Sequence, residues 1–333
     1  ARPPHPPLTL GGTPPPPPPH PARRVLHLCY PASKKKPRHI DRYIIGAKLI
    51  RLSYNAGFVE ACNTALAQVT GPALLYLNND LQLGMNACAL ALRRLFSAPD
   101  IGAVGGKLIR TNGLLQEAGS IIWRDGTTYG YLRDADPNCP EANFVREADY
   151  CSGAFLMLRT AVVRTLGGFD DDYRPAYYEE ADLCVRIRKS GMRILYDPSV
   201  VIQHFEFGSA DITASTRLMQ RNHKIFTGKH LDYLRYQHPP GLRNTVHARS
   251  PRRSGPQPGQ KRSEALRILF IEDRIPLRNL GAGYVRSNDI IHTMAALGHQ
   301  VSIFPIYKAT ASPIAIYRDM PETAEVFYER GME

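Results

Sequence analysis

The sequence lacks the features that mark several classes of protein. No run of about 18 or more apolar residues occurs, so no transmembrane helix is predicted. The first residue is Ala, not Met, and no apolar signal-peptide core follows it, so secretion is not expected. The six cysteines are scattered and form no CxxC pair. This pattern predicts a reduced, cytoplasmic protein without disulfides or a zinc site.

Positive charge, in contrast, is in excess. The formal net charge of the 333 residues is +12, which suits nucleic acid, an anionic membrane surface or phosphorylated substrates as partners. Two clusters hold much of it: Lys34, Lys35, Lys36 and Arg38, and Arg249, Arg252, Arg253, Lys261 and Arg262. Solvated linkers are the simplest interpretation of both clusters, and contact with a membrane or nucleic acid is the alternative.

Composition divides the chain into four parts. Residues 1–43 are rich in Pro and Lys and cannot build a core, so we expect a disordered arm. Residues 44–234 read as one α/β domain, and residues 235–265 form a basic linker rich in Pro and Gly. Residues 266–333 have the pattern strand, loop, helix, strand, which begins a second doubly wound domain.

The α/β domain alternates strands with helices, which predicts a mixed, mainly parallel sheet covered by helices. The expected strands are 48–54, 73–77, 101–109, 153–159, 193–197 and 199–204. The expected helices include 55–71 and 85–96, which have apolar residues at helical spacing. Residues 73–77 are five apolar residues in a row, as expected of a strand that is buried on both faces.

Polar groups follow two of these strands. Asn78, Asn79 and Asp80 come directly after the strand 73–77, and His204 ends the strand 199–204. In open α/β sheets, ligands bind at the carboxyl ends of the strands. A carboxylate and a neutral imidazole there would suit a divalent metal such as Mg²⁺ or Mn²⁺. A simple turn explains the Asn-Asn-Asp sequence equally well.

A second acidic stretch begins a predicted helix. In "YYEEADL", Glu179, Glu180 and Asp182 occupy the first helical turn, where the helix dipole favours carboxylates. Partial burial beside two aromatic residues would instead raise the pKa of one glutamate and make it a general base. Gly153, in "CSGAFLMLR", would allow close approach of a substrate to the backbone.

Taken in order, these segments resemble the family 2 glycosyltransferases of the GT-A fold, from about Lys48 to Lys229. "NAGFVEACN" resembles the start of that family's N-x-G-F helix, and "YLNND" its divergent DxD motif. "CSGAFLMLRTAVVRTLGGFDD" resembles the acceptor-side glycine loop and the turn after it. "YYEEADLCVRIRKSGMRILYDPSVVIQH" resembles the Y-x-E-D-x-D-L-C segment and the downstream histidine.

The resemblance implies a metal-dependent, inverting hexosyltransferase that uses a UDP-, dTDP- or GDP-sugar and a glycan or lipid-linked acceptor. Asp80 and His204 would hold Mn²⁺ or Mg²⁺, and Glu180 would be the catalytic base, with Glu179 as the neighbouring candidate. Gly153 and Asp182 would lie on the acceptor side. The donor would contact Asn55, Gly57, Asn63, Asn78, Asn79, Arg221 and Asn222. The cytoplasm is the expected location, at the inner face of the membrane if peripheral contact occurs.

Two further expectations concern the parts of the chain before and after the segment that resembles family 2. The family's first strands, which carry base and ribose contacts, have no counterpart here, so we expect a fold that is incomplete at its N-terminal edge. Residues 267–305 resemble the start of a GT-B, family 4-like glycosyltransferase domain, with Gly281 and Gly283 in the loop after its first strand. A tandem of two transferases would fit polysaccharide assembly.

Three alternatives to an active transferase stay open. A catalytically inactive, carbohydrate-binding remnant or scaffold would explain the missing nucleotide edge. A nucleic-acid-binding protein would explain the charge, but the basic residues lie mostly in linkers and no interleaving with aromatic residues occurs, so no nucleic-acid partner is expected. A glycoside hydrolase also uses two carboxylates, but it needs no metal-type Asp at the end of a strand.

Overall fold

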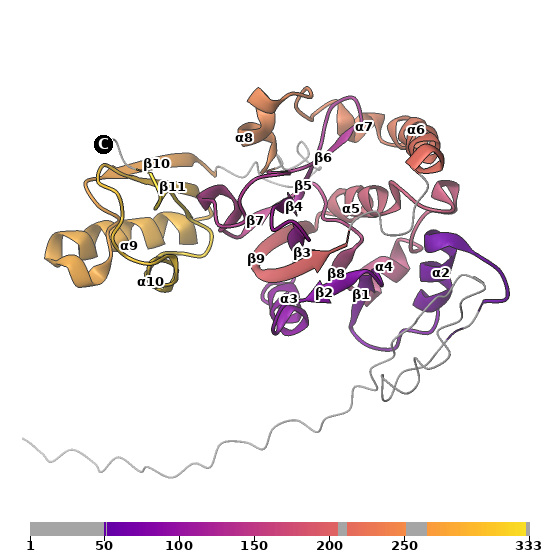
Figure 1. Ribbon diagram of the computed structural model, residues 1–333, viewed down its shortest axis with the longest axis horizontal. Helices are drawn as coiled ribbons and strands as arrows, with labels where there is room; N and C mark the ends of the chain where they lie inside the picture. Colours follow the sequence, from indigo (N-terminus) through magenta and orange to yellow (C-terminus); the bar gives the residue numbers. More distant parts are fainter. Residues whose placement is uncertain (1–49, 51, 206–211, 251–264, 331–333) are drawn as a thin grey trace, which may run out of the picture.

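The protein forms two α/β units that lie side by side (Figure 1). The computed structural model describes residues 50, 52–205, 212–250 and 265–330. The predicted arm of residues 1–43 lies outside the described residues, as do most of the two basic clusters. Residues 50 and 52–54 form no strand, so the described part of the predicted strand 48–54 is not extended into the sheet.

The larger unit is built on a seven-stranded mixed sheet. Five strands follow the order β1-β8-β3-β9-β2, and β4 and β7 pair with β3 and β9, respectively. The strands are β1 (Ala73–Leu77), β2 (Leu81–Leu83), β3 (Ile101–Arg110), β4 (Leu115–Ala118), β7 (Arg146–Glu147), β8 (Phe155–Arg159) and β9 (Arg193–His204).

The predicted α/β class with a mixed sheet is confirmed, and its parallel part is the long pair β3–β9. β1 runs in the same direction as these two strands, but β8 lies between β1 and β3 and is antiparallel to both. β2 returns antiparallel along β9. The carboxyl ends of β1 and β9 therefore lie at the same edge of the sheet as the start of β2 and β8.

Helices cover both faces of this sheet. Helix α3 packs on one face through Ala87, Ala91 and Leu95, against apolar residues of β3, β8 and β9. The other face packs against α2, α4, α5 and α6. The helices are α2 (Gly57–Leu66), α3 (Ala87–Leu95), α4 (Thr160–Thr165), α5 (Glu179–Lys189), α6 (Ile212–Lys229), α7 (Leu231–Leu234) and α8 (Thr245–Ala248). Because β3 is covered on both faces, eight consecutive residues of it are buried.

β9 is one strand where the sequence suggested two. Pro198 lies in its middle and cannot donate a ladder hydrogen bond, and the pairing with β3 shifts register between Gly106 and Lys107 at this point. Asp197 accepts hydrogen bonds from the main-chain nitrogen of Ser199 (3.0 Å) and from its hydroxyl (2.6 Å). This shift of register accommodates Pro198, so the strand continues to His204.

Residues 111–150 form a compact excursion from the sheet. They contain β4, the small antiparallel pair β5 (Ser120–Ile122) and β6 (Thr128–Gly130), the 3₁₀ turn η1 (Pro140–Ala142) and β7. Two other 3₁₀ turns of this unit are η2 (Asp171–Tyr173) and η3 (Leu242–Asn244). The excursion is buried at Ile121, Ile122 and Trp123, so it belongs to the main core.

The smaller unit has three parallel strands. The first two are those of the predicted βαβ pattern, and the short third strand was not predicted. Its elements are β10 (Arg267–Glu272), η4 (Arg278–Leu280), α9 (Ala282–Ala296), β11 (Gln300–Pro305), α10 (Pro313–Asp319) and β12 (Glu325–Val326). It has a separate core that includes Ile291, Ile303 and Val326. Gly281 precedes α9 with a φ of 143°, and Gly283 lies within the helix.

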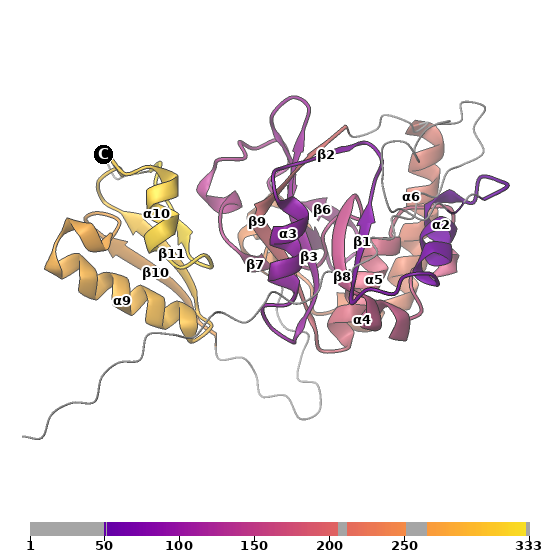
Figure 2. The same cartoon turned by 90° about the horizontal axis from the view of Figure 1, so that it is seen from below.

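The smaller unit, coloured orange to yellow, lies beside the larger one (Figures 1 and 2). Ion pairs join the two units. Arg249 makes a bidentate contact with Glu325, at 2.6 Å for each nitrogen–oxygen pair, and both side chains are buried or nearly so. Arg94 binds Asp197 at 2.7 Å and Glu322 at 2.6 Å. The prediction of a solvated linker is therefore wrong for residues 235–250, because this stretch forms η3 and α8 and buries Arg249.

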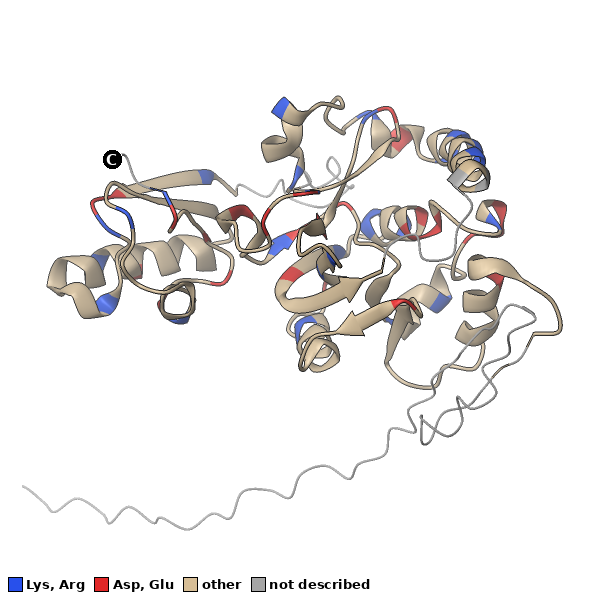
Figure 3. Cartoon of the chain, viewed as in Figure 1, with Lys and Arg blue, Asp and Glu red and all other residues tan. Residues whose placement is uncertain are grey.

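Both units carry charges of both signs, but α6 carries Arg217, Arg221, Lys224 and Lys229 and no acidic residue. Figure 3 shows Lys and Arg interspersed with Asp and Glu over the described part of both units. Among the described residues, no helix combines the length and apolar character needed to cross a membrane.

Candidate functional site

Asp80 and His204 meet at the edge of the main sheet. Asp80 lies between β1 and β2, and His204 is the last residue of β9. The antiparallel pairing places Leu81 opposite His204. The main-chain nitrogen of Phe205 also donates a hydrogen bond to the main-chain oxygen of Asp80, at 3.0 Å. Asp80 Oδ1 is thereby held 3.3 Å from His204 Nε2. The structure thus brings together the two predicted metal ligands, which are 124 positions apart in the chain.

A glutamine fixes the other side of the imidazole. Gln116 of β4 accepts a hydrogen bond from His204 Nδ1 through Oε1, at 2.7 Å. An oxygen acceptor at Nδ1 requires the proton there, which leaves the lone pair of a neutral imidazole on Nε2. Both Nε2 and Asp80 Oδ1 are buried atoms without a hydrogen-bond partner among the described residues.

These two atoms fit a divalent cation. A carboxylate oxygen and an imidazole nitrogen with a free lone pair are suitable ligands, and neither is bound by another protein group. The described residues contain no cluster of three or more His, Cys, Asp or Glu that could hold a metal. A cation here would therefore take its remaining ligands from water or from a bound phosphate, as Mg²⁺ commonly does.

Gly153 and Glu180 lie at the same edge. The main-chain nitrogen of Asn78 donates to the oxygen of Ala154 at 2.9 Å, which joins the end of β1 to the turn before β8. On the other side of this turn, the main-chain amide of Gly153 lies near the carboxylate of Glu180 and favours its charged form, which lowers its pKa. A Cβ added to Gly153 would lie 3.4 Å from Cβ of Glu180. The backbone at Gly153 therefore packs closely against the side chain of Glu180, and an alanine there would be in ordinary van der Waals contact with it.

Both glutamates at the start of α5 are held in poorly solvated positions. Burial raises the pKa of Glu180, although the amide of Gly153 opposes this effect. Burial and then the charge of Glu180 raise the pKa of Glu179 well above its ordinary value. One carboxylate oxygen of each residue is buried without a hydrogen-bond partner in the described part of the chain. A carboxylate in this state is a suitable general base.

A third carboxyl group, Glu117, supports the same turn. Its Oε1 accepts from the main-chain nitrogen of Ser152 at 3.0 Å, and its Oε2 accepts from the hydroxyl of Ser120 at 2.8 Å. Burial raises the pKa of Glu117 to about 7, and the charge of Glu180 adds to this shift. Gln116 and Glu117 are residues that the sequence did not reveal, because they lie in an excursion without a clear periodic pattern.

The loop before α5 has an unusual backbone. Tyr177 and Tyr178 both have a positive φ, of 78° and 72°. Asn222 of α6 holds this loop, because its side-chain nitrogen donates to the main-chain oxygens of Tyr173, Ala176 and Tyr177 at 2.8–3.1 Å. Asn222 is fully buried. These contacts give no support to its predicted role in donor binding; they make it a residue that positions the loop.

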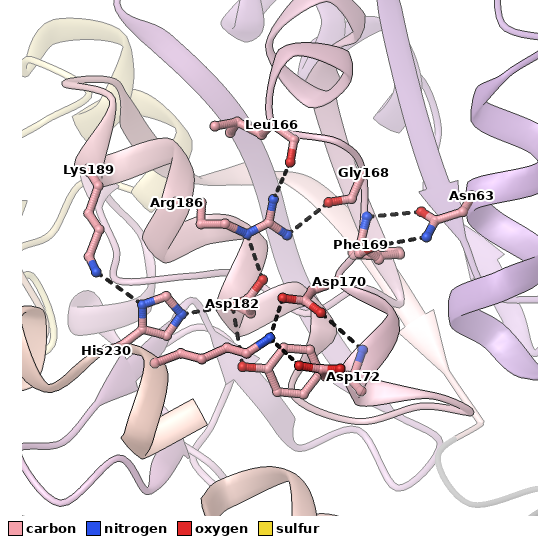
Figure 4. A network of polar contacts seen from close by, with 12 residues as sticks. Asn63, Leu166, Gly168, Phe169, Asp170, Asp172, Asp182, Arg186, Lys189 and His230 are labelled. Carbon is pink, nitrogen blue, oxygen red and sulfur yellow. Dashed lines mark hydrogen bonds and ion pairs between the residues drawn. The ribbon is translucent and has the colours of Figure 1, made fainter. Parts of the chain in front are cut away.

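Asp182 also has a structural environment. Its Oδ2 accepts from Arg186 Nε at 2.7 Å, and its Oδ1 lies 2.8 Å from His230 Nε2. Arg186 in turn donates to the main-chain oxygens of Leu166 and Gly168, and Figure 4 shows Asp182 within this network. The carboxylate is 1% exposed. The prediction that Asp182 lines the acceptor side finds no support in this arrangement.

Most of the residues on α2 and α6 that were predicted to bind the nucleotide-sugar instead contact the protein's own main chain. Asn63 makes two hydrogen bonds with Phe169, at 2.8 and 2.9 Å, as Figure 4 shows. Gly57 packs so tightly that an added Cβ would lie 2.5 Å from Cβ of Pro175. Arg221 donates to the oxygen of Arg174.

The other predicted donor contacts lie nearer to the surface. Asn55 accepts from the main-chain nitrogen of Gly57 at 3.2 Å. Asn78 is half-buried and Asn79 is exposed beside Asp80. Of the predicted donor residues, these two adjoin the edge that carries Asp80.

No family model matches the chain. The O-antigen biosynthesis protein RfbC of Myxococcus xanthus is 26% identical over 172 residues, which are 50% of this chain and 13% of RfbC. The rhamnosyltransferase WbbL of Escherichia coli is 35% identical over 57 residues, which are 17% of this chain and 21% of WbbL. The chain thus spans a minor part of the length of these relatives.

Among solved structures, the chain is similar to GalNAc-T7, crystallised with UDP, GalNAc and Mn²⁺. The TM-score is 0.50 at 14% sequence identity, and the match covers 64% of this chain and 43% of that one. The larger unit has the GT-A fold. The likeness at this identity concerns the arrangement of the sheet and its helices, on which the Asp80–His204 edge is built.

Proposed function

We propose that the larger unit carries out metal-dependent transfer of a sugar from a nucleotide-sugar to an acceptor hydroxyl. The observation that carries this proposal is the pair Asp80 Oδ1 and His204 Nε2, 3.3 Å apart at a strand-end edge and both without a hydrogen-bond partner in the described residues. Sugar-transfer proteins among the relatives and the GT-A fold support it.

In this reaction, the residues of the site would have the following roles. Asp80 and His204 would hold the cation, whose charge would neutralise the diphosphate leaving group. Glu180 would take the proton from the acceptor hydroxyl, with Gly153 on the acceptor side. Asn78 and Asn79 border the donor. Attack by the hydroxyl on the anomeric carbon, opposite the leaving group, inverts the configuration there.

The donor and acceptor classes follow from the same proposal. The donor would be a UDP-, dTDP- or GDP-sugar. A glycan or a lipid-linked glycan supplies the hydroxyl, and the name of RfbC, an O-antigen biosynthesis protein, supports this choice. We place the reaction in the cytoplasm, with peripheral membrane contact if the acceptor is lipid-linked. For the smaller unit we propose the start of a second, GT-B type transferase domain, supported by its parallel βαβ arrangement.

Calorimetric titration of the chain with UDP, dTDP and GDP, each with and without Mn²⁺, tests the proposal. We expect one nucleotide to bind with Mn²⁺ and to lose at least about 10-fold in affinity without it or in Asp80→Ala. Asp289→Ala, which removes an exposed carboxylate of the smaller unit, is the matched control and should bind normally. Binding that is equal in Asp80→Ala and the unchanged chain would contradict the metal site. Absence of binding to every nucleotide would favour the non-catalytic, glycan-binding alternative.

A further inference from the structure

Strand β4 contains a bulge beside the proposed site. In its pairing with β3, Glu117 lies opposite Leu108 and Leu115 lies opposite Ile109, so Gln116 is an extra residue without a partner. A β-bulge of this kind bends the strand and re-aims the side chains next to it. Bulges are frequent beside active sites for this reason.

The bulge lets two adjacent residues reach both halves of the site. Gln116 binds His204 on the metal side, and Glu117 binds the amide of Ser152 on the side of Gly153 and Glu180. Adjacent residues of a regular strand point to opposite faces of a sheet. Gln116 is buried, so its side-chain amide needs a partner inside the protein.

We propose that Gln116 is a positioning residue that fixes His204 as the Nδ1–H tautomer and turns the Nε2 lone pair toward Asp80. The purpose of this contact, which is to present His204 as a metal ligand, rests on the proposed function. Its physical basis is the 2.7 Å contact between Gln116 Oε1 and His204 Nδ1. A histidine protonated on Nε2 would direct a hydrogen at Asp80 and could not bind a cation through that atom.

The contact also determines where the ring lies. His204 is the last residue of β9, and its main chain is paired with Leu81 and Arg110. The backbone therefore fixes the origin of the side chain, while the bond to Gln116 fixes the rotation of the imidazole about its bond to Cβ. Hydrogen bonds of this kind to the non-ligating nitrogen typically change metal affinity by about 10–100-fold.

The tautomer can be measured in the metal-free chain by the ¹⁵N chemical shifts of its histidines, with His204→Gln used to assign the signal. We expect a protonated Nδ1 and an unprotonated Nε2 in the unchanged chain. In Gln116→Met, which keeps the length of the side chain but offers no strong acceptor, we expect the Nε2–H form to appear. Gln116→Glu retains an oxygen acceptor and should retain the Nδ1–H form.

Titration with Mn²⁺ and the nucleotide that binds gives the second measurement. We expect Gln116→Met to weaken Mn²⁺-dependent binding by about 10–100-fold, and Gln116→Glu to remain within a few-fold of the unchanged chain. Gln220→Met, on the exposed face of α6, is the control and should change neither measurement.

The two proposals fail in distinguishable ways. An Nε2–H tautomer in the unchanged chain, or the same Nδ1–H tautomer in Gln116→Met, would overturn the role of Gln116 even if nucleotides bind. A tautomer that changes as expected supports the role of Gln116 in orienting His204, even if no nucleotide binds and the proposed function fails. Because the unchanged chain is itself informative, the inference stays testable if Gln116→Met does not fold.

Discussion

The side chain of Asn222 donates a hydrogen bond to the main-chain oxygen of Tyr177, at 2.8 Å, from the middle of α6 to the loop that leads into Glu179 and Glu180. Tyr177 has a φ of 78°, a conformation that L-residues with large side chains rarely adopt. Such a backbone costs about 1–3 kcal/mol per residue and persists only where the surroundings enforce it. Asn222 supplies this constraint at a buried position.

Replacement of Asn222 by Ala should therefore destabilise the protein and loosen the start of α5. Three main-chain oxygens lose their donor in a buried place, so we expect a loss of roughly 2–4 kcal/mol in the free energy of unfolding. Urea denaturation measures it. Gln220→Ala, two residues away on the exposed face of α6, is the control and should change stability by less than about 0.5 kcal/mol. Equal stability of the two variants would show that the hydrogen bonds to the loop contribute nothing.

Activity should depend on the ionised form of Glu180. Burial raises the pKa of its carboxyl, so the rate should fall as the pH falls, with a midpoint above the ordinary value for glutamate of about 4.3. Glu180→Gln should lower the rate of nucleoside diphosphate release by about 10²–10⁴-fold and leave nucleotide binding intact. The measurement is the pH profile of release from the nucleotide-sugar whose nucleotide binds. A larger loss in Glu179→Gln than in Glu180→Gln would assign the base to Glu179 instead.

Glu117 should make stability depend on pH. Its pKa is raised from 4.5 to about 7 in the folded chain, mainly by burial. Between these values the folded chain keeps a proton that the unfolded chain has released, so stability falls as the pH rises through this window. As the pH rises from 4.5 to 8, the unfolding free energy of Glu117→Gln should therefore increase by up to about 3 kcal/mol relative to that of the unchanged chain.

Chemical denaturation at several pH values tests this prediction. The quantity to compare is the difference in unfolding free energy between Glu117→Gln and the unchanged chain at each pH. Glu329→Gln alters an exposed carboxylate and should give a difference that does not vary with pH. A difference for Glu117→Gln that is also constant with pH would show that the pKa of Glu117 is the same in the folded and the unfolded chain.

The buried pair Arg249–Glu325 should hold the two units together. Removal of one partner leaves the other charge buried, so Glu325→Gln should lower stability by roughly 3–5 kcal/mol. Glu141→Gln alters the more exposed pair with Arg330 and should cost less than about 1 kcal/mol. Thermal unfolding and limited proteolysis of both variants measure the effect. Similar behaviour of the two variants would mean that the buried pair does not hold the units together.

The sequence predicted those parts of the fold that have a local signal. The apolar run of β1 and the helical spacing of α2 and α3 predicted these elements to within a few residues. The proximity of Asp80 and His204 followed from a general rule, that polar residues at strand ends gather at one edge of a sheet.

What the sequence did not reveal depends on tertiary contacts. An asparagine in a motif does not show whether it meets a ligand or a main-chain group, and Asn63 and Asn222 do the latter. Gln116 and Glu117 carry no periodic signal, because a bulge removes the alternation that would have marked a strand. Arg249 belonged to a basic cluster by composition, but its partner Glu325 is 76 positions away.

The ion pairs between the units also limit where this chain can be divided for separate study. A shorter protein that stops after residue 250, within the segment that composition marks as a linker, would keep Arg94 and Arg249 but lose Glu322 and Glu325. Arg94 would still have Asp197, whereas Arg249 would stay packed over the rings of Tyr131 and Phe144 without its carboxylate. Expression of the larger unit alone would therefore benefit from an Arg249→Met substitution, or from keeping both units in one polypeptide.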